Sequence, residues 1–203
     1  MKNRRFTTSQ LTILGLMTAI LILMACTPLG YLNIGPLAVS FNVIPVAISA
    51  VVLGPTGGAV AGAVFGLTSF GQCINIGGSS AMGVMLFSIN PFLAFIQRFV
   101  PRLLDGICIG FIFRAMRKKT NTYVACAVTG FFSAFLNTLF FMSSLVVFFY
   151  NTDYIQGFVS TFGVTNPFAF VIAFVGVQGA IEAIVCFLLA GAISRALGTA
   201  LHK

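Results

Sequence analysis

The sequence predicts an all-α integral membrane protein with six transmembrane helices, and three observations carry this prediction. Of the 203 residues, 59% are hydrophobic and only 7% are charged, with a mean hydropathy of +1.06. A soluble domain of this size needs a hydrated exterior, which such a composition cannot supply. The apolar residues form continuous runs rather than the alternating pattern of a β-barrel. At about 20 residues per crossing, the chain accommodates about six helices and their loops.

The first predicted span is residues 8–27, and it ends before Pro28 and Gly30. The MKNRR segment before it resembles the basic start of a signal peptide. No convincing small-residue cleavage site follows, so we expect this helix to be retained.

The remaining spans follow from apolar runs separated by turn-forming or basic segments. An LGPTGG turn divides the second span from the third, and RKKTN separates the fourth from the fifth. We expect one membrane domain over residues 1–203, with the five further spans at 42–55, 57–72, 91–115, 122–149 and 167–196.

Basic residues predict the orientation. With six spans, three basic clusters fall on one side of the membrane, and the loops on the other side contain no Lys or Arg (28–41, 73–90 and 150–166). Positively charged loops stay in the cytoplasm, so both termini are expected there. This pattern also accounts for the net charge of +8 without a nucleic-acid partner. The nine clustered residues are Lys2, Arg4, Arg5, Arg114, Arg117, Lys118, Lys119, Arg195 and Lys203.

The fourth predicted span carries three charges, Arg98, Arg102 and Asp105, at spacings that place them on one helix face. Arg102 and Asp105 are three residues apart and can neutralise one another, whereas Arg98 has no such local partner. A lone arginine at membrane depth costs about 2.5–3.5 kcal/mol on insertion scales. Arg98 is expected about 10 Å below the outer end of its helix, where an anionic ligand could meet it. Snorkelling outward, or pairing with Glu182, is the alternative.

Further polar side chains are expected at or near membrane depth, where each must face another polar group, water or a ligand. One buried cation, several amides and abundant phenylalanine together predict a pocket for a small polar anion. Hydrogen bonding between helices is the alternative for each amide. These polar residues are Asn42, Gln72, Asn75, Asn137, Gln178 and Glu182.

The sequence offers little support for an enzyme. It contains no nucleotide-binding GxxxxGK[ST] motif, no Ser/His pair and no cysteine spacing typical of a metal site. We therefore expect no catalytic residues, no metal and no cofactor in this chain. If transport uses ATP, another subunit must hydrolyse it. Gly15 and Ala19 form a small-xxx-small spacing that lets another helix approach closely, either within this chain or from a partner.

Two segments resemble a known family: GYLNIGPLAVSFNVIPVAISAVVLGPTGGAVAGAVFGLTSF at 30–70, and RFVPRLLDG at 98–106. The chain resembles the substrate-binding S components of energy-coupling factor (ECF) transporters, and most closely the pantothenate-specific ones. The resemblance implies a multi-pass vitamin-capture subunit of a bacterial cell membrane. It also implies partnership with a membrane coupling subunit and two cytoplasmic ATPases, which would hydrolyse the ATP.

The same resemblance implies functional residues. It places ligand contacts at Tyr31, Asn42, Asn75, Arg98, Asn137 and Gln178, and contact with the coupling subunit at Gly15 and Ala19. The carboxylate of pantothenate would meet Arg98, while its amide and hydroxyls would use Asn75, Asn137 and Gln178. Folate, riboflavin, cobalamin or a queuosine precursor are alternative ligands, and a non-transporting membrane scaffold is an alternative function.

Overall fold

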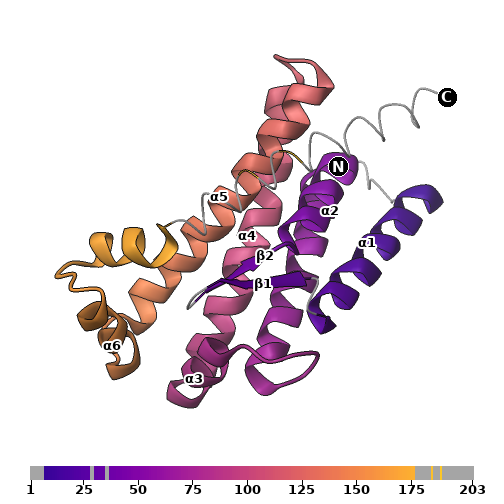
Figure 1. Cartoon of the computed structure of the whole chain (residues 1–203). Coiled ribbons are helices and arrows are strands. Elements are labelled where there is room, and N and C mark those ends of the chain that lie inside the picture. The colour runs from indigo at the N-terminus through magenta and orange to yellow at the C-terminus, as the bar shows by residue number, and fades with distance from the viewer. Residues whose placement is uncertain (1–6, 28–29, 35–36, 177–183, 185–187, 189–203) are drawn as a thin grey trace.

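The computed structural model describes residues 7–27, 30–34, 37–176, 184 and 188 (Figure 1). This part of the chain is helical apart from one short antiparallel hairpin. Its elements are α1 (Thr8–Cys26), β1 (Tyr31–Ile34), β2 (Leu37–Ser40), α2 (Val43–Gly71), the 3₁₀ helix η2 (Gln72–Ile74), α3 (Ala81–Ile89), α4 (Pro91–Arg117), α5 (Thr122–Phe149) and α6 (Asp153–Thr161). A further apolar helix covers Pro167–Gly176.

Helix α2 contains a reversal of chain direction at Gly54. This glycine has φ 74° and ψ −164°, a backbone conformation that other residues rarely adopt. A β carbon built on Gly57 would lie 2.8 Å from the carbonyl oxygen of Ser49, although eight residues of continuous helix span about 12 Å. Residues 43–53 and 55–71 therefore form two arms of a helical hairpin, and the reversal coincides with the LGPTGG segment.

A row of glycines holds the second arm of α2 directly against α4. A β carbon on Gly58 would overlap the carbonyl oxygen of Gly106, and one on Gly62 would overlap that of Arg102. One turn further along, a β carbon on Gly66 would lie 3.0 Å from atoms of Phe99. The absence of side chains along this row lets the two backbones approach closely. This close packing fixes where the charged residues of α4 lie relative to α2.

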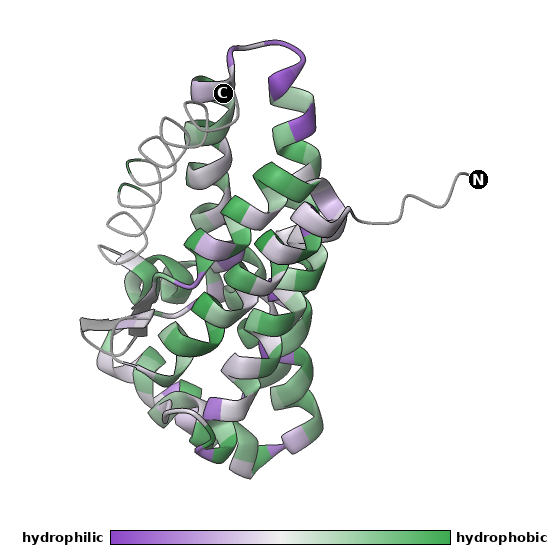
Figure 2. Ribbon diagram, turned by 90° about the vertical axis from the view of Figure 1, so that its right-hand side faces the viewer, coloured by the Kyte–Doolittle hydropathy of each residue, from purple (hydrophilic) through white to green (hydrophobic). Residues whose placement is uncertain are grey.

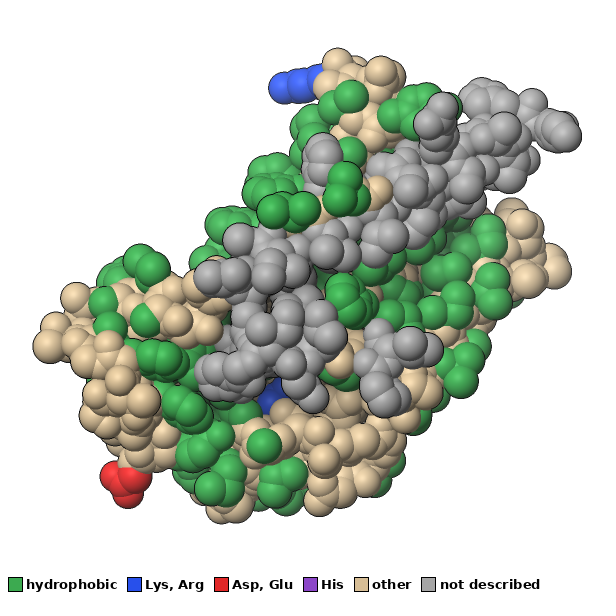
Figure 3. Space-filling view, in the orientation of Figure 1, with side chains coloured by type: hydrophobic (Ala, Val, Ile, Leu, Met, Phe, Trp, Pro, Cys, Tyr) green, Lys and Arg blue, Asp and Glu red, His purple; other side chains and the backbone are tan. Residues whose placement is uncertain are grey.

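The surface of the helices suits a lipid environment. Three described helices are long and apolar enough to cross a membrane: Thr8–Cys26, Val43–Ile74 and Thr122–Phe149. The 27-residue α4 is of similar length but carries the three charges in its interior. Hydrophobic residues dominate the helices, and a strongly hydrophilic segment lies at the end where α4 connects to α5 (Figure 2). Hydrophobic side chains also cover much of the described surface in Figure 3.

Segments expected to be loops on the outer side contain secondary structure of their own. The first holds the β1–β2 hairpin, in which Tyr31 pairs with Ser40. The second holds η2 and α3, and the third holds α6. In Figure 1, α3 and α6 lie at the end of the bundle opposite the α4–α5 connection. One end of the bundle is thus built from short elements, and the other from a tight turn.

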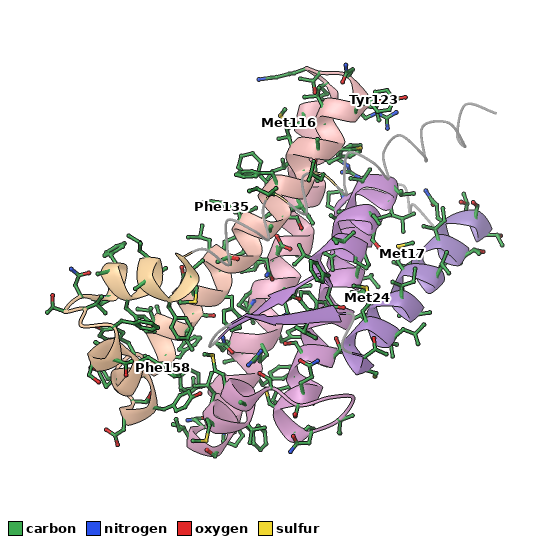
Figure 4. The ribbon with its side chains drawn as sticks, viewed as in Figure 1. Met17, Met24, Met116, Tyr123, Phe135 and Phe158 are labelled. Carbon is green, nitrogen blue, oxygen red and sulfur yellow. The ribbon has the colours of Figure 1, made fainter. Side chains whose placement is uncertain are left out.

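Aromatic packing attaches α6 to the end of α5. Phe158 lies on the side of α6 that faces the bundle (Figure 4), edge to face with Tyr154 and Phe174 at centroid distances of 5.3 and 5.4 Å. Phe170, in turn, lies 6.2 Å from Tyr150. These rings belong to a hydrophobic cluster that reaches α3 and Ala94 of α4. The cluster closes the bundle below the charged part of α4.

Candidate functional site

Arg98 of α4 is buried in the bundle, with only 6% of its side chain exposed. Its guanidinium donates hydrogen bonds to two hydroxyl groups: Nη1 to Ser69 Oγ at 3.5 Å and Nη2 to Ser80 Oγ at 3.1 Å. Its Nε has no hydrogen-bond partner among the described residues. Within the described part of the chain, Arg98 forms no ion pair. The positive charge is therefore held by neutral groups on two sides, and it is turned away from the lipid.

Local structure explains both serine contacts. Ser80 is the N-cap of α3, where its hydroxyl also accepts a hydrogen bond from the Gly83 backbone amide at 3.2 Å. Ser69 lies three residues beyond Gly66, on the arm of α2 that packs against α4. Gly83 leaves the room that Arg98 needs, since a β carbon there would lie 2.9 Å from Nη2. Arg98 is thus held between the end of α2 and the start of α3.

Arg102 lies one turn further along α4 and extends the same interior layer. Its Nη1 donates to the Arg98 carbonyl oxygen at 3.0 Å, and its guanidinium lies over the rings of Phe65 and Phe141, 4.8 and 5.1 Å from their centroids. Arg98 lies over the same Phe141 ring at 5.4 Å. Contacts of a cation with an aromatic face stabilise the charge without neutralising it. The Phe141 ring therefore contacts both guanidinium groups.

Helix α5 presents polar groups on the same side as Phe141. Ser133, Asn137 and Phe141 are spaced four residues apart, which places them on one helix face. All three are buried, and Asn137 is only 7% exposed. The Ser133 hydroxyl and the Asn137 Oδ1 have no hydrogen-bond partner among the described residues. Asn137 accordingly lies one turn from the Phe141 ring that both arginines contact. Its side-chain carbonyl oxygen can accept a hydrogen bond from a ligand.

The hairpin and the start of α2 contribute a further group of predicted residues. Asn42 is completely buried and donates through Nδ2 to the Gly30 carbonyl oxygen at 3.4 Å. Its Oδ1 and the hydroxyls of Tyr31 and Ser40 are buried without a described hydrogen-bond partner. Tyr31 packs against the hydrophobic cluster that contains Leu21 and Phe65. Tyr31 therefore lies beside the hydrophobic cluster that contains Phe65, and Asn42 directly precedes Val43 of the same cluster.

Gln72 and Asn75 differ from the other predicted polar residues. Gln72 is 5% exposed, and its Nε2 donates to the Ala25 carbonyl oxygen at 3.0 Å, which ties η2 to the end of α1. Asn75 is exposed and adopts the left-handed conformation, with φ 60° and ψ 27°, at the end of η2. In this conformation of the protein, Gln72 supports the scaffold, and Asn75 forms a turn at the surface.

Replacing Gln72 with leucine is expected to destabilise the protein by about 1–3 kcal/mol, because the buried Ala25 carbonyl oxygen would lose its donor. The unfolding temperature of the purified protein in detergent measures this effect. Gln156→Leu, which removes a donor from a part-buried bond in α6, serves as the comparison and should cost less. An unchanged unfolding temperature for Gln72→Leu would contradict the scaffold role.

The remaining predicted residues divide into two pairs. Gln178 and Glu182 lie outside the described residues. Gly15 and Ala19 are both exposed on α1, and no described atom lies within 4 Å of a β carbon built on Gly15. The small-residue spacing is therefore on the outward face of α1, whereas Leu21 and Ala25 face the bundle.

Sequence reasoning missed four residues at this site: Ser69, Ser80, Phe141 and Gln97. Ser80 directly precedes an apolar helical run, which is a typical N-cap signal. Phe141 follows Asn137 at helical spacing, so its face could have been inferred. Gln97 is completely buried, and neither its Oε1 nor its Nε2 has a hydrogen-bond partner in the described part of the chain.

Together these groups form a buried, electropositive site lined by hydroxyls, amides and aromatic rings. Among the described residues, no cluster of three or more His, Cys, Asp or Glu side chains could hold a metal ion. Charge-assisted hydrogen bonds to a carboxylate are strong where water is excluded. The arrangement is suited to binding a small organic anion.

Comparisons with known proteins identify the family of the chain. Residues 9–194 match the family model described as "ECF transporter, substrate-specific component". The chain is also 34% identical over 143 residues to the "Pantothenate transporter PanT" of Leuconostoc mesenteroides, an alignment that covers 65% of this chain and 65% of that relative. The resemblance seen in residues 30–106 is thereby confirmed. The chain belongs to the membrane-protein family of ECF transporter substrate-specific components.

Proposed function

We propose that this chain captures pantothenate outside a bacterial cell and delivers it inward as part of an ATP-driven importer. The observation that carries the proposal is the buried Arg98 guanidinium, whose described partners are hydroxyls and an aromatic ring rather than a carboxylate. A ligand carboxylate would supply the missing negative charge. The name of the Leuconostoc relative supports the choice of vitamin.

The rest of the ligand has suitable partners within the same layer. Pantothenate has an amide and two hydroxyls besides its carboxylate. The Asn137 Oδ1 can accept a hydrogen bond from either kind of group, and the Phe141 ring can contact the dimethyl carbon chain. Gln178, which lies outside the described residues, is proposed as a further contact, as is Asn75 if its loop turns inward on binding.

Mass spectrometry of the small molecule that remains bound through purification in mild detergent would test the proposed vitamin. We expect pantothenate, together with saturable binding of added pantothenate in calorimetry. Recovery of folate, riboflavin or another vitamin, with no pantothenate binding, would overturn the choice of substrate while leaving the family membership intact.

The proposed topology has six crossings, with both termini in the cytoplasm. The tight α4–α5 connection contains Lys118 and Lys119 and lies opposite the end that holds α3 and α6. Cytoplasmic segments are enriched in basic residues, so this end is assigned to the inside. Capture from outside then requires entry past the hairpin, α3 or α6.

We further propose that a coupling subunit packs against α1 at Gly15 and Ala19, and that two cytoplasmic ATPases power transport. The small residues are on the exposed face of α1, which leaves room for close approach of a partner helix. In this proposal, the chain itself binds neither ATP nor another cofactor.

Replacing Gly15 with leucine is expected to abolish vitamin uptake and co-purification of the coupling subunit. Pantothenate affinity of the isolated protein should stay within about twofold of the original, because the substitution blocks only the outward face of α1. Gly157→Leu is the matched control, since Gly157 is equally open. It belongs to α6, and this helix lies far from α1 in Figure 1. Normal uptake by the Gly15→Leu variant would rule out this interface.

A further inference from the structure

Gln97 has an unusual environment for a glutamine. The residue is 0% exposed, yet neither its amide oxygen nor its amide nitrogen has a hydrogen-bond partner among the residues that the structure describes. Two other buried amides in the described part of the chain, those of Asn42 and Gln72, each donate to a backbone carbonyl. Burying an amide without a hydrogen bond to its oxygen or its nitrogen costs folding free energy, so such a group in a native protein calls for a specific explanation.

The neighbours of Gln97 on α4 offer no internal partner. Ala94 and Pro101 lie three and four residues away and therefore share its helix face, and both are apolar. Ala94 belongs to the same hydrophobic cluster as Phe141, the ring that lies beneath Arg98 and Arg102. Gln97 consequently lies at the boundary between this cluster and the charged layer of the site.

We infer that Gln97 is a substrate-contacting residue that recognises a neutral amide or hydroxyl group of the ligand, next to the carboxylate held by Arg98. A primary amide both donates and accepts, so it can satisfy either group. The inference rests on the proposed function and deepens it, because it adds a recognition point for the uncharged part of the vitamin. A ligand with a carboxylate alone would leave Gln97 unsatisfied.

Two anchors on consecutive residues would also give the site selectivity. A site that hydrogen-bonds a neutral group rejects analogues that lack the group, because its own polar atoms are then buried unpaired. Arg98 would bind many carboxylates, whereas Gln97 would require an amide or hydroxyl at a set distance from the carboxylate. Small carboxylates such as β-alanine should therefore bind poorly to the unsubstituted protein.

The test compares Gln97→Leu with the unsubstituted protein in detergent, using pantothenate and panthenol, in which an alcohol replaces the carboxylate. Affinity for both compounds should fall at least about tenfold in Gln97→Leu, because the lost contact is with their shared amide or hydroxyls. The ligand-free unfolding temperature should stay the same or rise, since the variant removes an unpaired buried amide. Gln72→Leu is the matched control, and its ligand-free unfolding temperature should fall because its amide is bonded within the protein.

Either of two results would overturn the inference. Pantothenate affinity within twofold of the original would show that Gln97 does not contact the ligand. A ligand-free unfolding temperature that falls as far as in Gln72→Leu would show that the amide has a structural bond instead. A wrong choice of vitamin can be distinguished from a wrong role for Gln97, because the unsubstituted protein would then not bind pantothenate. The same comparison would then be made with the vitamin identified by mass spectrometry, and the same two results would decide it.

Discussion

Replacing Arg98 with methionine is expected to lower the affinity for pantothenate by roughly 30-fold to several thousand-fold. Loss of one partner from a buried, hydrogen-bonded charge pair costs about 2–5 kcal/mol, and each 1.4 kcal/mol corresponds to a factor of ten. Methionine retains much of the length and apolar surface of arginine, so packing against Phe141 should survive. Isothermal titration of the purified protein with pantothenate measures the change.

Panthenol and a lysine variant make this prediction specific to charge. Panthenol lacks the carboxylate, so its weaker binding should change little on Arg98→Met. Arg98→Lys should fall between the original protein and Arg98→Met, because an ammonium keeps the charge but cannot bond two carboxylate oxygens in a planar fork. If both compounds lost affinity equally, the guanidinium would be supporting the fold rather than binding a carboxylate.

Hydropathy and sequence motifs were sufficient to predict that the chain is a membrane protein and to which family it belongs. The burial of Arg98 could also be predicted, because a charge in an apolar span must find a polar environment. Its serine partners could not be predicted with the same ease. Ser69 and Ser80 are separated from Arg98 by 29 and 18 residues, and only the packing of α2 and α3 against α4 brings the three together.

The short elements at one end of the bundle were beyond sequence reasoning for a different reason. The segment that contains β1 and β2 is rich in turn-forming residues, which indicated a loop. Pairing of Tyr31 with Ser40 and of Phe41 with Gly30 depends on hydrogen bonds across the segment rather than on local propensity. Gln72 illustrates the same limit, since periodicity marks a polar residue without revealing that Ala25 is its partner.

Replacing Gly58 with alanine is expected to be strongly destabilising, because Gly58 lies at the contact between α2 and α4. The added carbon would overlap the Gly106 carbonyl oxygen and lie 2.9 Å from the Ala50 β carbon, so backbone rather than a flexible side chain must move. Overpacking of this kind costs about 1–3 kcal/mol or more, which exceeds the roughly 1 kcal/mol that alanine gains over glycine in a helix. The unfolding temperature in detergent should therefore fall.

Gly157→Ala in α6 provides the control with the opposite sign, because nothing described lies within 4 Å of its added carbon. Its unfolding temperature should stay the same or rise, owing to the better helix propensity of alanine. Gly58→Ala should also weaken pantothenate binding, since separating α2 from α4 moves Ser69 away from Arg98. An unfolding temperature for Gly58→Ala equal to that of Gly157→Ala would mean that the two helices can separate at no cost. The glycine row could then not be what positions Arg98.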